Sequence, residues 1–297
     1  MDFGKLPSVD NVDFSLPADA PHNAARLAAS GPAREPGFRI GTPRFADPGY
    51  RGKLVPKGAE MLPHYAKHFA TVELNSTYYA LDGDQCARWG DAVAGLDFRF
   101  CPKLPAELSH AGRMTPRPGQ LERILEQFLR FGESLGTCWV LPPPDFTPRD
   151  LPILERFLDA WGARWPLAVE LRHEGWFKGG AVEVFELLAQ HGATAVITDT
   201  AGRRDVIHQQ LTGKRVFLRF VGNRLHASDF ARLDAWAKRL GQWFDQGVEQ
   251  FDLFMHQPEE HLCTEAAMHL VDALAAHGID GLRKPQPIPV ETQGSLF

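Results

Sequence analysis

The stretch Thr71-Val72-Glu73-Leu74-Asn75-Ser76-Thr77-Tyr78-Tyr79 decides which fold the chain is expected to adopt. Polar and apolar residues alternate along it, so that Glu73 and Asn75 lie on the face opposite Val72 and Leu74. A period of two residues is typical of a β-strand. We therefore predict a strand over residues 71–79 that carries a carboxylate and an amide on one face.

The same combination of alternation and charge recurs twice further along the chain. Ala168-Val169-Glu170-Leu171-Arg172-His173 places Glu170 and Arg172 on one face, and Arg215-Val216-Phe217-Leu218-Arg219-Phe220 places Arg219 beside Phe217. Segments with helical patterns separate these runs. Charges near the C-terminal ends of several such strands are expected to converge on one place.

Eight strand-like runs alternate with helical patterns in about 240 residues, which predicts an α/β fold, the (β/α)8 TIM-type barrel. A doubly wound sheet is the alternative, but Gly41-Thr42-Pro43-Arg44-Phe45 lacks the glycine fingerprint that dinucleotide binding needs after the first strand. The predicted strands cover residues 38–45, 71–79, 97–104, 137–142, 166–173, 193–200, 215–222 and 251–257. The predicted helices cover residues 121–129, 151–161, 182–190, 230–243 and 265–276, with a short polar one over 203–210.

Three segments are expected along the chain. Residues 1–36, rich in Pro, Ala and Asp, predict an N-terminal arm outside the core, and residues 37–281 predict the barrel. Residues 282–297 predict a flexible tail, because prolines at high density prevent regular helix or sheet.

Composition narrows the class of protein. The chain has 297 residues, 44% of them hydrophobic, and a net charge of −5, which does not indicate a global attraction to nucleic acid or to anionic membranes. The four cysteines are scattered and predict neither a disulfide framework nor a zinc site. With no long apolar run and no signal-peptide pattern, a cytoplasmic protein is expected.

Two long motifs resemble those of a known family. Residues 72–79 and the stretch Ala168 to Trp176 look like the signature motifs of the YecE-like family, known as domain of unknown function seventy-two, with Gly41-Thr42 and Pro142-Pro143-Pro144 in matching order. The resemblance covers about Phe38 to Ala276 and implies a TIM-type barrel, while it implies no settled activity. The chain departs from the family pattern at Arg44-Phe45, at residues 141–142, at Val221-Gly222 and at His256-Gln257.

One set of polar residues shares the parity of the predicted barrel interior. A charge left unpaired in a dry interior costs several kcal/mol or more, so these residues must pair with one another, face a wet cleft, or both. They form either a structural ion-pair network that fills the barrel or a ligand pocket. The set is Glu73, Asn75, Lys103, Glu170, Arg172, Asp199, Arg219 and His256.

The candidate chemistry follows from these residue types. Glu73, Glu170 and Asp199 are candidates for general acid and base catalysis. Lys103, Arg172 and Arg219, with Arg44 as a possible fourth cation, suit a phosphate or carboxylate ligand. Further ligand-binding candidates are Asn75, Tyr78, His110, His173, Trp176 and His256.

Two of these groups have ordinary alternatives. Tyr78, Tyr79 and Trp176 form either a stacking wall for a sugar or base, or ordinary rim packing. His110, His173 and His256, with the acidic residues, imitate a metal site, but no metal-binding spacing occurs, so we predict no metal. The sequence defines no cofactor.

The last five residues supply an independent clue. Gln293-Gly294-Ser295-Leu296-Phe297 resembles the short peptide by which bacterial replication and repair proteins dock on the DNA sliding clamp. Leu296 and Phe297 would fill an apolar pocket while Gln293 hydrogen-bonds at its edge. The alternative is a tail that folds onto the barrel through Phe297.

Three functions remain open from the sequence. The first is an enzyme, a hydrolase or isomerase, that acts on an anionic, phosphate-containing ligand, with nucleic acid among the candidates. The second is a sugar-phosphate isomerase, and the third is a non-enzymatic DNA-repair accessory protein recruited by its tail. A basic groove at the barrel mouth would favour nucleic acid, and a small closed pocket would favour a sugar phosphate.

Overall fold

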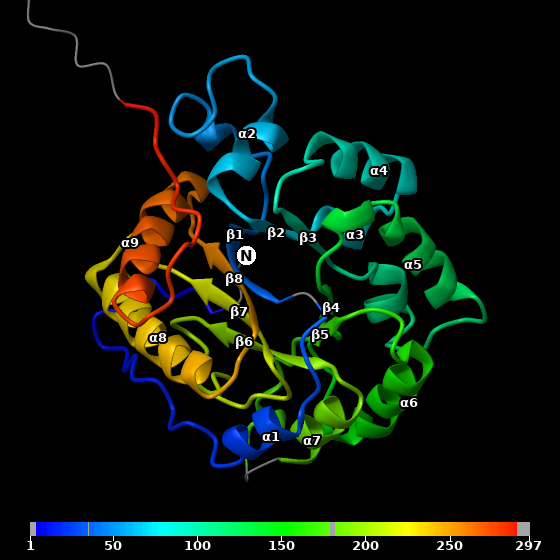
Figure 1. Cartoon of the computed structure of the whole chain (residues 1–297). Coiled ribbons are helices and arrows are strands. Elements are labelled where there is room, and N and C mark those ends of the chain that lie inside the picture. Colours follow the sequence, from blue (N-terminus) through cyan, green and yellow to red (C-terminus); the bar gives the residue numbers. More distant parts are fainter. Residues whose placement is uncertain (1–3, 35, 179–181, 290–297) are drawn as a thin grey trace, which may run out of the picture.

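The computed structural model describes residues 4–34, 36–178 and 182–289. Eight strands, all parallel, form one sheet with the order β3-β2-β1-β8-β7-β6-β5-β4. The predicted α/β barrel is therefore confirmed (Figure 1). The strands are β1 (Gly37–Thr42), β2 (Thr71–Leu74), β3 (Arg99–Pro102), β4 (Cys138–Val140), β5 (Leu167–Val169), β6 (Thr194–Asp199), β7 (Arg215–Val221) and β8 (Gln250–His256).

The sheet closes on itself through sparse pairing between β3 and β4. Isolated parallel bridges join Phe100 to Leu135 and Lys103 to Trp139. The amide of Leu104 donates to the carbonyl of Trp139 at 2.8 Å, and that of Gly136 donates to the carbonyl of Phe100 at 2.8 Å. The barrel is thus nearly closed.

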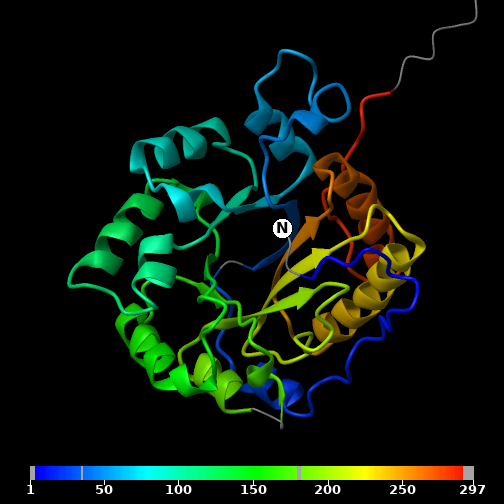
Figure 2. The same ribbon diagram turned by 180° about the vertical axis from the view of Figure 1, so that it is seen from behind.

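Helices surround the barrel on the outside, as the two opposite views show (Figures 1 and 2). Each longer helix presents an apolar stripe to the sheet; in α5, for example, Leu121, Ile124 and Phe128 are buried. The α-helices are α1 (Asn23–Ala29), α2 (Met61–His68), α3 (Ser76–Tyr79), α4 (Gly83–Ala92), α5 (Gln120–Leu129), α6 (Leu151–Trp161), α7 (Glu183–Gln190), α8 (Ala227–Asp245) and α9 (Cys263–Ala275). Shorter helical turns cover Pro48–Tyr50, Glu107–Ala111, Gly132–Ser134, Pro148–Asp150, Glu174–Trp176 and Glu260–Leu262.

Two apolar clusters follow from the alternation of side chains along the strands. The larger lies between strands and helices and contains the outward-facing Val72, Leu74 and Val169. The smaller contains inward-facing residues and forms an apolar layer within the barrel, with polar residues toward either end. Its members are Cys101, Trp139, Leu141, Ala168, Val196, Phe217 and Phe254.

The decisive stretch is a strand only over its first half. β2 ends at Leu74, and Ser76–Tyr79 form the helical turn α3, so the prediction of a strand through Tyr79 is wrong. The hydroxyl of Thr77 donates to the carbonyls of Leu74 and Lys103, at 3.0 and 2.8 Å. These bonds stabilise the turn directly above the strand end and draw β2 and β3 together.

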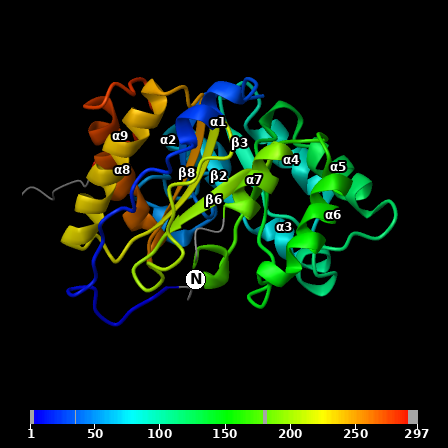
Figure 3. The same ribbon diagram turned by 90° about the horizontal axis from the view of Figure 1, so that it is seen from below.

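Helix α1 of the N-terminal arm packs against the outside of the barrel. The loop between β6 and β7 contains no helix, so the prediction over residues 203–210 is wrong. α1 packs there instead: the Asn23 amide donates to the carbonyl of Gln209 at 2.7 Å, and Leu27 is buried in the main core. Residues 1–36 were expected outside the core, yet this segment supplies a helix that the barrel lacks at that point. Figure 3 shows the arm running along the outside to α1.

The first part of the predicted flexible tail is bonded to the barrel. Arg283 donates to the carbonyls of Ala66 and Phe69, at 2.6 and 2.9 Å, and the amide of Ile288 donates to the carbonyl of Lys53 at 2.7 Å. Among the described helices, none combines the length and the apolar character that a membrane crossing requires.

Candidate functional site

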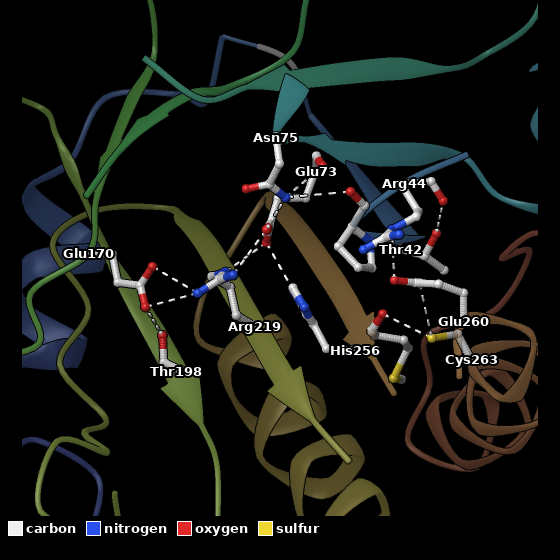
Figure 4. A network of polar contacts seen from close by, with 12 residues as sticks. Thr42, Arg44, Glu73, Asn75, Glu170, Thr198, Arg219, His256, Glu260 and Cys263 are labelled. Atoms are coloured by element: carbon white, nitrogen blue, oxygen red, sulfur yellow. Dashed lines mark hydrogen bonds and ion pairs between the residues drawn. The ribbon is translucent and has the colours of Figure 1, made fainter. Parts of the chain in front are cut away.

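Arg219 is the hub of the polar layer near the C-terminal ends of the strands (Figure 4). Its Nε and Nη2 donate to the two carboxylate oxygens of Glu73, at 2.7 and 3.0 Å. Its Nη1 donates to both oxygens of Glu170, at 2.9 and 2.8 Å. All three side chains are completely buried, so this is a built ion-pair network rather than a surface contact.

Burial opposes the ionisation of both glutamates, but their partners outweigh it. Arg219 and His256 hold the pKa of Glu73 well below its usual value, and Arg172 and Arg219 lower the pKa of Glu170 to about 2. Burial lowers the pKa of Arg219, and the two glutamates raise it further than burial lowers it. Both carboxylates are therefore ionised at neutral pH, which makes them weak proton acceptors and firm anchors.

Further side chains complete the coordination of the two carboxylates. The Asn75 amide donates to Glu73 Oε1 at 2.8 Å, and His256 Nε2 lies 3.1 Å from Glu73 Oε2. Burial lowers the pKa of His256, although Glu73 raises it. On the other side, Arg172 Nε and Thr198 Oγ1 donate to Glu170 Oε1, at 2.8 and 2.9 Å.

Lys103 follows the end of β3 and belongs to the same neighbourhood. Its amine lies 4.1 Å from the centre of the Tyr78 ring and 4.9 Å from that of Trp139, whose ring centre is also 5.0 Å from the Arg219 guanidinium. Burial lowers the pKa of Lys103 to about 8, with Arg219 and Arg172 adding to this and the two glutamates opposing it. We call Glu73, Asn75, Lys103, Glu170, Arg172, Arg219 and His256 the mouth cluster.

Two partly exposed side chains border Lys103. The His110 ring lies edge-on to Tyr78, with ring centres 5.2 Å apart, and its Nδ1 is 3.0 Å from Ser109 Oγ. Burial, Lys103 and Arg172 lower the pKa of His110, and burial raises the pKa of Tyr78. At neutral pH, His110 is therefore a neutral ring and Tyr78 a neutral phenol, both beside the amine.

Glu260, which the sequence prediction missed, is the other unusual carboxyl near this end of the barrel. It follows β8, is 8% exposed, and its Oε1 lies 3.1 Å from Arg44 Nε (Figure 4). Burial nevertheless raises its pKa to about 8, and Asp47 and Glu73 add to the effect. The Arg44 side chain is 62% exposed, so water screens its attraction, and burial prevails. The only signal for Glu260 in the sequence is its position shortly after a predicted strand. This signal does not distinguish Glu260 from the neighbouring Glu259.

Asp199 does not join the mouth cluster. Thr198 faces inward on β6, and Asp199 therefore faces outward, where it accepts hydrogen bonds from Trp236 Nε1 at 2.7 Å and from Arg232 on α8. Arg204 is also paired with it. The prediction that Asp199 faces the barrel interior is wrong.

Two other candidates, Trp176 and His173, have structural roles, and Tyr79 is exposed. Trp176 is buried in the main core and donates to the carbonyl of Phe146 at 2.9 Å, so the stacking-wall interpretation does not hold for it. His173 Nδ1 accepts from the amide of Gly175 at 3.1 Å, as a cap of the following turn. Tyr79 is 83% exposed, with its ring edge-on to Tyr78.

A surface hollow of about 550 Å³ lies at the opposite end of the barrel, near the starts of β6 and β7. Its lining includes Arg26 and Lys214. Arg26 donates to the carbonyl of Leu211 at 3.0 Å, and Lys214 is paired with Glu249 at 2.7 Å. Both cations are engaged, and active sites of such barrels lie at the C-terminal ends of the strands, so the mouth cluster is the better candidate.

Neither a metal site nor the tail peptide can be placed at the mouth. Over the described ranges, no three His, Cys, Asp or Glu side chains gather in an arrangement that could hold a metal ion. Gln293, Leu296 and Phe297 lie outside the described residues, so the clamp interpretation stays a prediction.

The fold and the paired mouth cluster define a parallel α/β barrel with a polar C-terminal mouth. A family model described as "Protein of unknown function DUF72" matches residues 39–290, and the chain belongs to this family. The predicted family resemblance is thereby confirmed.

Individual relatives agree with this assignment. The chain is 31% identical to protein YecE of Escherichia coli over 284 residues, which are 87% of this chain and 99% of YecE. It also resembles the crystal structure of a DUF72 family protein from Enterococcus faecalis, with a TM-score of 0.63, 19% identity, and coverage of 86% of this chain and 100% of that one. For a DUF72 family protein from Thermotoga maritima the TM-score is 0.60 and the identity 22%, over 78% and 96% of the two chains.

Proposed function

We propose that the mouth cluster binds a small anionic molecule with a phosphate group and that the protein is an enzyme acting on this molecule. The observation that carries the proposal is the charge balance of the cluster. The carboxylates of Glu73 and Glu170 are matched by the guanidiniums of Arg219 and Arg172, which leaves the charge of Lys103 without a counterion. A ligand anion would supply that counterion.

The environment of Lys103 supports this proposal. Its amine has neither a hydrogen bond nor an ion pair with any described residue, and the partly exposed side chains of Tyr78 and His110 border it. Arg219, which the carboxylates of Glu73 and Glu170 hold rigidly, forms the bottom of the proposed site beneath Lys103. Such a preorganised arrangement of charges lowers the cost of binding an anion, because little has to reorganise.

Proton-transfer chemistry of the hydrolase or isomerase type fits the titration of two groups. Lys103 and Glu260 both have a pKa of about 8, one lowered and the other raised by burial. Groups that titrate near the working pH are the effective general acids and bases. Glu73 and Glu170, which the sequence suggested for this role, serve better as anchors of Arg219.

A small molecule is favoured over nucleic acid by the pairing of arginines in the loops at the barrel mouth. In the loops that follow β3, β6 and β7, Arg113 pairs with Asp145, Arg203 with Asp205, and Arg224 with Glu259. These pairs do not offer the continuous basic surface that a phosphate backbone needs. We also expect a cytoplasmic location, which the four buried cysteines support, because none of them forms a disulfide.

Calorimetric titration with inorganic phosphate tests the proposal. The wild-type protein should bind phosphate, and Lys103→Met should weaken the affinity at least about tenfold, the equivalent of about 1.4 kcal/mol. Lys57→Met, which removes an exposed lysine, is the matched control and should bind as the wild type does. Equal phosphate affinity in Lys103→Met and the wild type would overturn the proposal.

A further inference from the structure

Lys103 differs from other lysines of the protein in what surrounds its amine. Lys178, Lys214 and Lys284 each lie within 2.7 Å of a carboxylate oxygen. Lys103 Nζ instead rests between the faces of Tyr78 and Trp139. No described residue accepts a hydrogen bond from Lys103 Nζ. The charged form of the amine is therefore not stabilised by a hydrogen-bond partner.

The nearby carboxylates are already occupied. Glu73 accepts hydrogen bonds from Arg219 and Asn75, with His256 also in contact, and Glu170 accepts from Arg219, Arg172 and Thr198. Two guanidiniums near the amine also disfavour a further positive charge there. A half-buried amine beside cations and aromatic rings is the setting in which lysine acts as a nucleophile.

We propose that Lys103 Nζ forms an imine with the carbonyl carbon of a small anionic aldehyde or ketone bound at the barrel mouth. This inference rests on the proposed function and names the substrate class, a carbonyl compound that carries a phosphate group. The charged form of Lys103 would draw the anionic end to the mouth, where Arg172 would contact it, and the neutral form of Lys103 would react with the carbonyl.

The reaction balances without an oxidant or a reductant. The lone pair of the neutral amine attacks the carbonyl carbon, and the electron pair of the C=O bond moves to oxygen, which takes up a proton to give a carbinolamine. Nitrogen gives up one of its two protons, and the hydroxyl takes up a proton and leaves as water while the nitrogen lone pair forms the C=N bond. Loss of the second N–H proton then gives the neutral imine. The amine lies over the Tyr78 ring, and the His110 ring lies edge-on to Tyr78, so that this phenol and this imidazole would give and take the protons.

Reductive trapping tests the inference on the full-length protein. The protein is incubated at neutral pH with dihydroxyacetone phosphate and sodium cyanoborohydride, and peptide mass spectrometry locates the reduced adducts. Because lowering the pKa of an amine by one unit raises its neutral fraction about tenfold, Lys103 should be labelled at least about tenfold faster than the exposed Lys57 in the same sample. Lys103→Arg should lose this fast adduct and retain slow labelling of Lys57.

The outcomes separate the two proposals. Fast labelling of Lys103 that inorganic phosphate suppresses supports both the imine and the anion site. Calorimetric binding of phosphate with labelling of Lys103 no faster than that of Lys57 overturns the imine and leaves the proposed function standing. Fast labelling that phosphate does not suppress supports the imine and contradicts a phosphate site at Lys103. Because Lys57 is an internal reference in the wild-type protein, the result does not depend on the folding of a variant.

Discussion

Two buried arginines, Arg219 inside the barrel and Arg232 outside it, hold networks of similar chemistry and different surroundings. Arg219 joins Glu73 and Glu170, and Arg232 joins Asp199 and Asp229 at 2.9 and 3.4 Å. Both guanidiniums are almost completely shielded from water. In composition the two networks are nearly the same.

The outer network is sealed by its neighbours. The Arg232 guanidinium lies 4.2 Å from the centre of the Phe220 ring and 4.8 Å from that of Phe14 of the N-terminal arm, and it donates to the carbonyl of Val221. Trp236 closes the other side by bonding Asp199. The inner network instead borders the half-buried Lys103. The two networks thus differ in one respect: the inner one adjoins a half-buried amine that has no acidic partner among the described residues.

Removal of either arginine should give the largest effect. Arg219→Met leaves two carboxylates buried without their main partner, and Arg232→Met does the same to Asp199. We expect each to lower the free energy of unfolding by about 3–5 kcal/mol, with Arg219→Met the more damaging. Urea denaturation measures this, with the exposed Arg88→Met as a control that should change little. A loss below about 1 kcal/mol in Arg219→Met would contradict the network described here.

The pH dependence of the unfolding free energy should distinguish the barrel mouth, where Glu260 lies, from the outer network around Arg232. Because burial raises the pKa of Glu260 from 4.5 to about 8, the folded protein holds a proton in this range that the unfolded chain releases. The stabilisation is complete below about pH 4.5 and is lost as the pH rises toward 8, at up to about 1.4 kcal/mol per pH unit. Glu260→Gln should remove this fall from the pH dependence of the unfolding free energy. Parallel curves for Glu260→Gln and the wild type between pH 5 and 8 would show that Glu260 titrates normally.

A crossed pair of variants sharpens the comparison. Asp199→Asn should cost about 3 kcal/mol of stability, since Arg232 loses a charged partner, and should leave phosphate affinity unchanged. Lys103→Met should do the opposite, because it removes an uncompensated charge from a half-buried position: stability holds and phosphate affinity falls at least about tenfold. For both variants, calorimetry gives the phosphate affinity and urea denaturation gives the free energy of unfolding. Loss of phosphate affinity in Asp199→Asn, at a temperature where it is folded, would mean that the outer network also serves the ligand.

The C-terminal peptide should have no effect on either network. If Gln293, Leu296 and Phe297 dock on the bacterial sliding clamp, the protein should bind the purified clamp at micromolar-class affinity, about −8 kcal/mol. The double change Leu296→Ala with Phe297→Ala should abolish binding and leave the melting temperature unaltered. The clamp prediction fails if the wild-type protein shows no saturable binding at tens of micromolar.

Strand parity predicted most of the mouth cluster from the sequence. Glu73, Glu170 and Arg219 alternate with apolar neighbours, and the structure brings all three together. The same rule assigned Asp199 to the wrong face of its strand. Both faces of a parallel strand in a barrel are buried, so that parity alone does not say which face is the interior. Thr198 and Asp199 could each have faced inward.

The remaining errors come from contacts that are distant in sequence. β2 ends at Leu74 instead of continuing to Tyr79, because the turn that follows bonds through Thr77 to the carbonyl of Lys103, 26 residues away. α1 packs where a helix was predicted over residues 203–210, although it lies about 180 residues earlier in the chain. No local sequence pattern could indicate this contact. Glu260 begins the short helical turn Glu260–Leu262 between β8 and α9, and a turn of three residues has no period from which its burial could be predicted.

The pKa of Lys103 itself tests the central claim most directly. It can be measured by NMR from the chemical shift of its ¹³Cε as a function of pH, with Lys103→Arg to assign the signal and Lys57 as the reference. We expect a pKa of about 8 for Lys103, which rises when inorganic phosphate is added because the anion stabilises the charged amine. A pKa near 10.5 that does not respond to phosphate would contradict the claim that the barrel mouth presents an unbalanced cation to a ligand.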